Sequence, residues 1–280
     1  MKDKIGLVLG GGGARGAAYI GVLKALEENN IKFDFIVGTS IGSVAGAALA
    51  YGVSSTELFD IAKTLSTKDI KPNLIPFMPS STDGIAKMCE RIFKDKSITF
   101  EDLKTTFCAV ATDLRTGEEY DIIKGDLIPA ICASCGVPGI FYPVTYDNTL
   151  LADGGLVNNI PSSVAKKFGC TKIVAVDLHS KRGEGTDSDK FFDLLLASIK
   201  IMMKSNSQKG YLDSDIMIQP DLAKFNVAKI ENIEDMIKEG YLATIRKMPE
   251  IKRIFGEKLE VIDNKSDKNQ IKYKIWEEKH

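Results

Sequence analysis

The chain has few histidines, no long apolar run and no excess of charge of either sign. His179 and His280 are the only histidines among 280 residues. No stretch approaches the roughly 20 apolar residues that a membrane-spanning helix needs. The 37 lysines and arginines balance 38 aspartates and glutamates, which leaves a formal net charge of −1. This balance argues against a broad electrostatic grip on nucleic acid, so we expect no nucleic-acid partner.

Cysteine is also sparse, and its five positions fit neither a disulfide framework nor a metal site. An odd number leaves one thiol unpaired in any disulfide scheme, and most of the five lie in apolar surroundings, as buried free thiols do. We therefore expect a reducing, cytoplasmic environment. Cys132 and Cys135 have the C-x-x-C spacing, but no second pair and no nearby histidine completes a zinc site. We expect no metal and no other cofactor.

The chain does contain two glycine-rich turns, each between a predicted strand and a predicted helix. The first follows Ile5–Leu9 and consists of Gly11, Gly12, Gly13, Ala14, Arg15 and Gly16. The second, Gly38-Thr39-Ser40-Ile41-Gly42, follows Phe33–Val37 and has the G-x-S-x-G pattern. A glycine turn at a helix N-terminus presents backbone N–H groups to negative charge. Because the G-x-S-x-G turn exposes a serine hydroxyl in a tight elbow, the pair predicts acyl transfer through a serine ester.

The first turn also matches the G-x-G-x-x-G fingerprint of dinucleotide-binding folds. That fingerprint requires an acidic residue at the end of the second strand, where it holds a ribose hydroxyl. Here the strand runs into Gly38-Thr39-Ser40, and the nearest acid, Asp34, lies at its beginning. A phosphate-binding P-loop would need a lysine followed by serine or threonine, which the turn lacks. Both nucleotide interpretations are therefore disfavoured.

A serine nucleophile needs a base that removes its proton, and Asp153 is the strongest candidate. It follows the apolar residues Leu150-Leu151-Ala152. Gly154 and Gly155 come next and let the backbone turn sharply beside a ligand. An aspartate has an ordinary pKa of about 3.9, and burial in a cleft would raise it toward the range that a base needs.

Other bases stay open. His179 follows the predicted strand Lys172–Asp177, so a Ser40–Asp153–His179 triad would match the chain order of α/β-hydrolases. Asp113 and Asp177 also lie at strand ends, but neither has glycines beside it.

The order of the predicted elements favours an α/β fold. Ile5–Leu9, Ala14–Glu28, Phe33–Val37 and Ile41–Tyr51 alternate as strand and helix, which is typical of a parallel sheet covered on both faces. Further strands are predicted at Phe107–Thr112, Glu119–Ile123, Tyr142–Tyr146 and Lys172–Asp177. Further helices are predicted at Ser55–Leu65, Gly84–Phe93, Leu127–Ser134, Pro161–Phe168, Lys190–Lys204 and Ile233–Lys247.

Together the motifs resemble the patatin-like phospholipase family. The resemblance rests on the two glycine turns, on Asp153-Gly154-Gly155, and on Ala133-Ser134, Pro138, Phe141 and Pro143-Val144 just before that aspartate. All of them occur in the family's order, between residue 5 and about residue 178. The last hundred residues are not covered, so the choice of substrate stays open.

The resemblance implies a three-layer α/β/α fold with a mainly parallel sheet, and a serine acyl hydrolase that cleaves lipid carboxylic esters. It implies Ser40 as nucleophile, Asp153 as base and an oxyanion hole at Gly11, Gly12 and Gly13. The residues expected to support these motifs are Ala14, Arg15, Gly16, Gly38, Gly42, Gly154 and Gly155. We expect Arg15 to order its turn rather than to attract an anionic head group. An acyltransferase that uses the same serine, and a catalytically idle lipid-binding regulator, are the alternatives.

We predict a patatin-like acyl hydrolase domain over residues 1–255 and a C-terminal extension over residues 256–280. Leu259–Ile262 and Gln270–Trp276 alternate apolar and polar residues, which predicts a hairpin packed on the same domain. Lys71–Ser81 is an apolar loop for which we favour peripheral packing. The predicted helix around Phe191–Met203 is apolar on nearly every side, which favours core packing and leaves a lipid- or subunit-facing surface open. Peripheral contact with a membrane is therefore an option, and the oligomeric state is not predicted.

Overall fold

The computed structural model describes residues 3–64, 79–179, 186–225 and 232–256, and eight strands within these segments form one sheet. The strands are β1 (Ile5–Leu9), β2 (Phe35–Thr39), β3 (Thr106–Asp113), β4 (Glu119–Ile122), β5 (Val144–Tyr146), β6 (Thr149–Asp153), β7 (Lys172–Val176) and β8 (Ile216–Ile218). Their order is β5-β6-β3-β2-β1-β7-β8, and β4 pairs with β3. The five strands from β3 to β8 in this order run parallel, whereas β4 and β6 run antiparallel to β3 and β5 runs antiparallel to β6. The predicted α/β fold with a mainly parallel sheet is confirmed.

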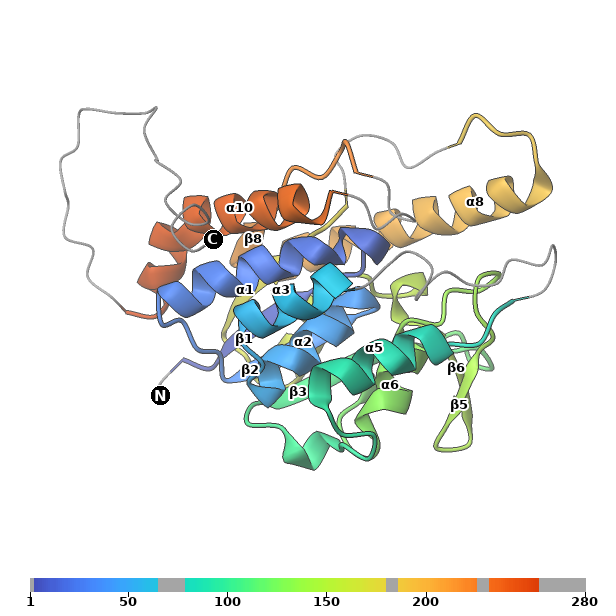
Figure 1. Cartoon of the computed structure of the whole chain (residues 1–280), viewed down its shortest axis with the longest axis horizontal. Helices are drawn as coiled ribbons and strands as arrows, with labels where there is room; N and C mark the ends of the chain where they lie inside the picture. Colours follow the sequence, from blue (N-terminus) through green and yellow to red (C-terminus); the bar gives the residue numbers. More distant parts are fainter. Residues whose placement is uncertain (1–2, 65–78, 180–185, 226–231, 257–280) are drawn as a thin grey trace.

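Helices cover both faces of this sheet (Figure 1). They are α1 (Ala18–Glu28), α2 (Ile41–Tyr51), α3 (Ser55–Thr64), α5 (Asp83–Phe93), α6 (Leu127–Ser134), α7 (Ser162–Lys167), α8 (Phe191–Asn206), α9 (Gln208–Asp213) and α10 (Ile233–Ile254). Three short 3₁₀ turns are η1 (Gly13–Ala17), η2 (Phe100–Asp102) and η3 (Gly154–Leu156). α1, α2, α3, α5 and α10 gather on one face, and α7 packs against β1, β2 and β7 on the other.

Side chains of the central strands alternate between two cores. Leu7 and Leu9 of β1 belong to the larger core, on the side of α1 and α2, and Val8 belongs to a smaller core with Val164 and Ala165 of α7. All five side chains are fully buried. Burial on both faces explains why these strands read as continuous apolar runs in the sequence.

Glycines allow α1 and α10 to cross closely. A Cβ atom on Gly21 would stand 1.9 Å from the carbonyl oxygen of Ile237, and one on Gly240 would stand 2.0 Å from that of Ala18. Any larger residue would push the two backbones apart. This contact holds α10 against α1, the helix that follows the first glycine turn.

Two predicted features lie wholly or mainly outside the described residues: the hairpin segments Leu259–Ile262 and Gln270–Trp276, and residues 71–78 of the apolar loop. Among the helices in the described segments, none combines the length and apolar character needed to cross a bilayer.

Candidate active site

Ser40 stands at a sharp turn between the end of β2 and the start of α2. Its backbone angles are φ 55° and ψ −130°, a region that costs a non-glycine residue about 1–3 kcal/mol. Neighbouring serines hold the turn. Ser43 donates to the Ser40 carbonyl from both its N–H and its Oγ at 2.7 Å, and the Ser40 N–H donates to Ser134 Oγ at 2.9 Å. This geometry is the elbow that the G-x-S-x-G pattern predicts.

The two glycines of the elbow are required because backbone passes close to each. A Cβ atom on Gly38 would lie 2.3 Å from the carbonyl oxygen of Gly42. One on Gly42 would lie 2.0 Å from the carbonyl oxygen of Leu9, at the end of β1. The elbow therefore fits tightly against the strand that leads into the first glycine turn.

The substitution Gly42→Ala is accordingly expected to lower the free energy of unfolding by at least about 2 kcal/mol, since the rigid backbone of β1 must move. Gly136→Ala is the matched control, because its Cβ would meet its nearest neighbour, the Ala133 carbonyl oxygen, at 3.3 Å. Urea unfolding of both variants measures the difference. Equal loss of stability in the two would contradict the close approach at Gly42.

The first glycine turn lies beside the elbow. A Cβ atom on Gly16 would stand 2.1 Å from Cγ1 of Ile41, the residue after the serine, so the two turns are in contact. The N–H of Gly11 donates to the carbonyl of Asn159 at 3.2 Å. Within the described segments, no hydrogen bond engages the N–H of Gly12 or Gly13. Within this turn, the N–H groups of Gly12 and Gly13 are therefore available to receive negative charge.

Arg15 is buried at the first glycine turn. Its Nε donates to the carbonyl of Phe225 at 3.1 Å, and its N–H donates to the carbonyl of Gly12 at 3.3 Å. A guanidinium that donates to a carbonyl of the protein itself supports the expected ordering role.

Asp153 ends β6 and is fully buried beside the elbow. Its Oδ1 accepts from the N–H of Gly155 at 2.8 Å, and its Oδ2 is buried without a hydrogen-bond partner. Burial raises the pKa of Asp153 to about 6, against the opposing effects of the Ser40 hydroxyl, the Gly155 N–H and His179. Ser40 is thus close enough to influence the carboxylate, although no hydrogen bond of normal geometry joins the two side chains. The structure brings together the predicted serine and the predicted base.

The rival bases are engaged elsewhere. Asp177 accepts from the N–H of His179 at 2.8 Å and from the hydroxyl of Tyr211. Burial alone would raise the pKa of Asp177, but hydrogen bonds from His179 and Tyr211 outweigh it and lower that pKa. The Asp113 carboxylate caps its own turn by accepting from the N–H of Arg115 at 2.8 Å. Both carboxylates therefore have other partners, whereas the Ser40 hydroxyl acts on the Asp153 carboxylate.

His179 lies near the site but makes no hydrogen bond to Ser40 or Asp153 among the described contacts. Its Nδ1 lies 3.2 Å from Asn159 Nδ2 and 3.3 Å from Asp177 Oδ1. The imidazole can therefore accept from the amide or donate to the Asp177 carboxylate, according to its tautomer. This arrangement favours a Ser40–Asp153 dyad over the triad.

Residues 7–166 match the family model for patatin-like phospholipases. This match spans more than half of the chain and includes both glycine turns and Asp153. The chain belongs to the patatin-like phospholipase family. Members of this family are typically serine lipid hydrolases.

Curated relatives include human patatin-like phospholipase domain-containing protein 6 and the rat domain-containing protein 7. Each is 36% identical over 202 residues, or 69% of this chain. An uncharacterized NTE family protein of Mycobacterium tuberculosis is 27% identical over 266 residues, or 85% of this chain. The chain spans only 14–15% of the first two relatives and 45% of the third. The crystal structure of VipD from Legionella pneumophila shares the fold at a TM-score of 0.58 and 15% identity, over 89% of this chain and 67% of that one.

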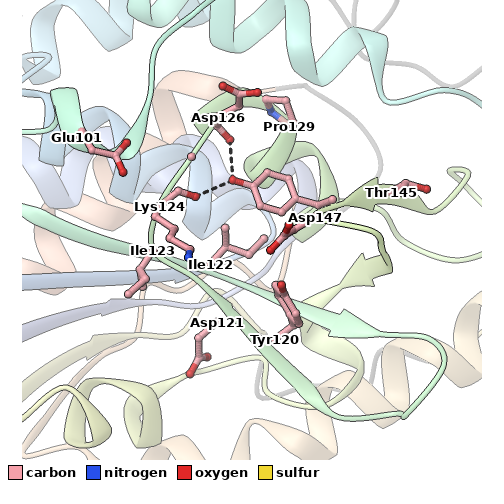
Figure 2. Close-up of a pocket in the computed structure, with 12 residues that line it drawn as sticks. Glu101, Tyr120, Asp121, Ile122, Ile123, Lys124, Asp126, Pro129, Thr145 and Asp147 are labelled. Atoms are coloured by element: carbon pink, nitrogen blue, oxygen red, sulfur yellow. Dashed lines mark hydrogen bonds between the residues drawn. The ribbon is translucent and has the colours of Figure 1, made fainter.

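A cavity of about 620 Å³ lies beside β4 and β5, apart from the patatin motifs. Figure 2 shows the residues that line it. Its lining includes Tyr120, Lys124 and Tyr146, and the Tyr146 hydroxyl donates to the carbonyls of Lys124 and Asp126. Neither Ser40 nor Asp153 lines it. Among the described residues, no cluster of histidine, cysteine or acidic side chains could hold a metal ion.

Asn159 is the residue of this site that the sequence interpretation missed. It is fully buried. Its carbonyl accepts from the N–H of Gly11, its amide nitrogen lies near His179 Nδ1, and its amide oxygen lies near Gly11 and Gly155. The available signal was the polar pair Asn158-Asn159 between apolar residues, downstream of the Asp153 motif.

Proposed function

We propose that the protein is a serine acyl hydrolase that cleaves lipid carboxylic esters, with Ser40 as nucleophile and Asp153 as base. The observation that carries the proposal is a serine on a strained elbow beside a buried carboxylate with a raised pKa and an unpartnered oxygen. A base with a pKa of about 6 is ionised at neutral pH yet basic enough to accept a proton in the transition state.

The reaction runs in two steps on these groups. Ser40 Oγ attacks the ester carbonyl while its proton passes to Asp153, and the N–H groups of Gly12 and Gly13 stabilise the oxyanion; losing one such donor typically costs about 10²–10³ in rate. Protonated Asp153 then returns the proton to the departing alcohol. Water hydrolyses the acyl ester on Ser40, with Asp153 again as base.

The direct test is to supply the purified protein with p-nitrophenyl esters of short and long acyl chains and with phosphatidylcholine vesicles. We expect free fatty acid as product, and labelling of Ser40 by a fluorophosphonate, located by peptide mass spectrometry. Addition of a primary alcohol separates the rival acyltransferase, which would give the alkyl ester as main product. If the folded protein neither releases acyl groups nor reacts with the fluorophosphonate, the proposal is wrong.

We further propose that α8 contacts the lipid surface from which the substrate comes. Phe191 is 68% exposed, and Leu194, Leu195, Ile201 and Met202 are also exposed. At 100° per residue these side chains share one helix face, which carries no charged residue. Figure 1 shows α8 extending along one end of the molecule. A contiguous exposed apolar surface of this kind is typical of an interaction site, and it suits the acyl region of a bilayer.

The opposite face of α8 rests on the site. A Cβ atom on Gly155 would lie 2.3 Å from Cε of Met203, and one on Gly139 would lie 3.7 Å from Phe192. The same helix therefore touches the turn after Asp153 and exposes an apolar stripe. Insertion of the stripe would bring the site to the bilayer surface.

The triple variant Phe191→Gln, Leu194→Gln, Ile201→Gln is expected to weaken sedimentation with phosphatidylcholine vesicles by about 100-fold, at roughly 1 kcal/mol for each partly buried side chain. Ile123→Gln is the control, because Ile123 is 43% exposed, close to the 47% of Leu194, but lies beside β4. Equal vesicle binding by the wild type and the triple variant would remove the membrane role of α8.

A further inference from the structure

Two unpartnered oxygen atoms lie together at the candidate active site. Within the described segments, three buried side-chain oxygens have no hydrogen-bond partner, namely Asp121 Oδ1, Asp153 Oδ2 and Asn159 Oδ1. Asp121 belongs to β4 and pairs through its other oxygen with Lys167. The remaining two belong to the candidate base and to the residue that holds Gly11. Buried acceptors without donors are rare in folded proteins. The Ser40 hydroxyl acts on the Asp153 carboxylate in the free enzyme, but this hydroxyl is lost once Ser40 carries an acyl group, and both oxygens then lack a donor.

The Asn159 amide oxygen faces the space between the serine and the base. A Cβ atom on Gly11 would stand 2.5 Å from Asn159 Oδ1 and 3.3 Å from Cβ of Ser40. One on Gly155 would stand 2.9 Å from the same oxygen and 3.1 Å from Asp153 Oδ1. A side chain at either glycine would crowd this oxygen. The Met203 methyl also borders this region, since its Cε lies 2.3 Å from the Cβ position of Gly155.

Hydrogen bonds fix which end of the Asn159 amide points there. Asn159 Nδ2 lies 3.1 Å from Ser207 Oγ, and Ser207 Oγ gives its own proton to the carbonyl of Met203, also at 3.1 Å. The serine oxygen can therefore only accept from the amide, which places the nitrogen at this side. His179 Nδ1, at 3.2 Å, is a second partner for Nδ2. The oxygen is left toward Ser40 and Asp153.

We propose that Asn159 Oδ1 and Asp153 Oδ2 together bind the water that hydrolyses the acyl-Ser40 ester. This inference rests on the proposed function. The water donates one hydrogen bond to each oxygen, which directs its lone pair at the acyl carbon. Asp153 takes the first proton as the new C–O bond forms, and returns it to Ser40 Oγ as the bond from the acyl carbon to Oγ breaks. The second proton, which the water shares with Asn159 Oδ1 as a hydrogen bond, stays on the water oxygen and becomes the proton of the carboxylic acid product, so atoms and charges balance.

Acylation does not need Asn159 in this scheme, because the proton moves from Ser40 to Asp153 and no water takes part. Loss of the amide oxygen is therefore expected to slow deacylation selectively. The isosteric substitution Asn159→Leu removes the acceptor, and Asn159→Asp keeps an oxygen at the same place. Ser207→Ala removes only the hydroxyl that orients the amide, so it tests the same role with a smaller change.

The experiment is rapid mixing of each variant with p-nitrophenyl butyrate. Asn159→Leu should show a burst of about one p-nitrophenolate per enzyme and then a steady rate lowered about tenfold or more, with the acyl group on Ser40 in the intact mass. Asn159→Asp should deacylate faster than Asn159→Leu, and Ser207→Ala should show a weaker burst. Thermal unfolding shows whether Asn159→Leu is folded. If it is not, the presence or absence of a burst in Ser207→Ala tests the role of Asn159.

Two results overturn the inference alone: deacylation as fast as in the wild type, or an equal fall in acylation and deacylation, which would indicate a merely structural residue. A wild type that never acylates Ser40 contradicts the proposed function itself, and the inference with it. The two failures are distinguished by the wild-type reaction in the same experiment.

Discussion

Replacement of Ser40 by alanine is expected to reduce ester hydrolysis by about 10⁴-fold or more, because it removes the hydroxyl that forms the acyl ester. Alanine keeps the Cβ atom and the backbone hydrogen bonds of the elbow, which come from Ser43 and Ser134 rather than from the Ser40 hydroxyl. The fold should therefore persist, and thermal unfolding should change little. Steady-state hydrolysis of p-nitrophenyl butyrate measures the loss.

The control is Ser97→Ala, since Ser97 Oγ only binds Asp95 in an exposed turn. It should retain the wild-type rate. Activity of Ser40→Ala within tenfold of the wild type would contradict the assignment of Ser40 as nucleophile. It would indicate instead that a base activates water to attack the ester directly. Fluorophosphonate labelling of the same variant provides an independent readout, because labelling elsewhere would reveal another reactive serine.

The parallel half of the fold could be predicted from the sequence because its signals are local. Ile5–Leu9 and Ile41–Tyr51 have the predicted bounds, since an apolar run between glycine turns leaves little choice. β2 instead begins at Phe35 and continues through Thr39, because its pairing with β1 and β3, and not its own composition, sets its ends.

Two short strands are absent from the predicted set, the antiparallel β6 and the parallel β8. The sequence marks β6 only as an apolar stretch before Asp153. In the structure, Asp147 and Asn148 just before it both have positive φ, at 48° and 59°. Consecutive positive φ values are typical of tight hairpin turns, and asparagine and aspartate adopt them readily. The dipeptide was the available signal for the β5–β6 hairpin that places the candidate base. β8 has three residues, too few for a periodic pattern.

Helix ends followed tertiary contacts as well. α10 was predicted to end at Lys247 but runs to Ile254, through Pro249. Met248 and Ile251 are buried, so packing outweighs the hydrogen bond that the proline cannot donate. The helix predicted from Ala14 begins instead as the 3₁₀ turn Gly13–Ala17, which shapes the candidate oxyanion site.

The sequence predicts which residues form the candidate dyad, but it does not predict their hydrogen bonds or their arrangement in space. The motifs name Ser40 and Asp153, whereas the capture of the Gly11 N–H by Asn159 depends on a contact between distant segments. The same is true of the two unpartnered oxygens. Local patterns therefore identify which groups react, and only the packed structure shows which of their atoms are left available.

The substitution Asp153→Asn is expected to lower kcat/KM by about 10³-fold or more, since an amide cannot take the proton of Ser40. Asp113→Asn is the matched control, because that carboxylate only caps its own turn. In the wild type, kcat/KM should rise with pH and level off above about pH 6, where Asp153 is ionised. Loss of activity in Asp113→Asn, or a profile flat between pH 5 and about pH 8, would contradict Asp153 as base.

The same variant is expected to be more stable than the wild type at alkaline pH. Burial raises the pKa of Asp153 to about 6, above the value of about 3.9 in the unfolded chain, so ionisation costs the folded state about 3 kcal/mol. This cost is absent below about pH 4, grows as the pH rises, and is complete above about pH 6. The free energy of unfolding of Asp153→Asn, measured with urea, should therefore exceed that of the wild type by about 1–3 kcal/mol at pH 8. The difference should vanish near pH 4. The ionised Asp153 destabilises the folded protein because its buried Oδ2 has no hydrogen-bond donor. Equal stability of Asp153→Asn and the wild type at both pH values would indicate that Asp153 is an ordinary solvated group.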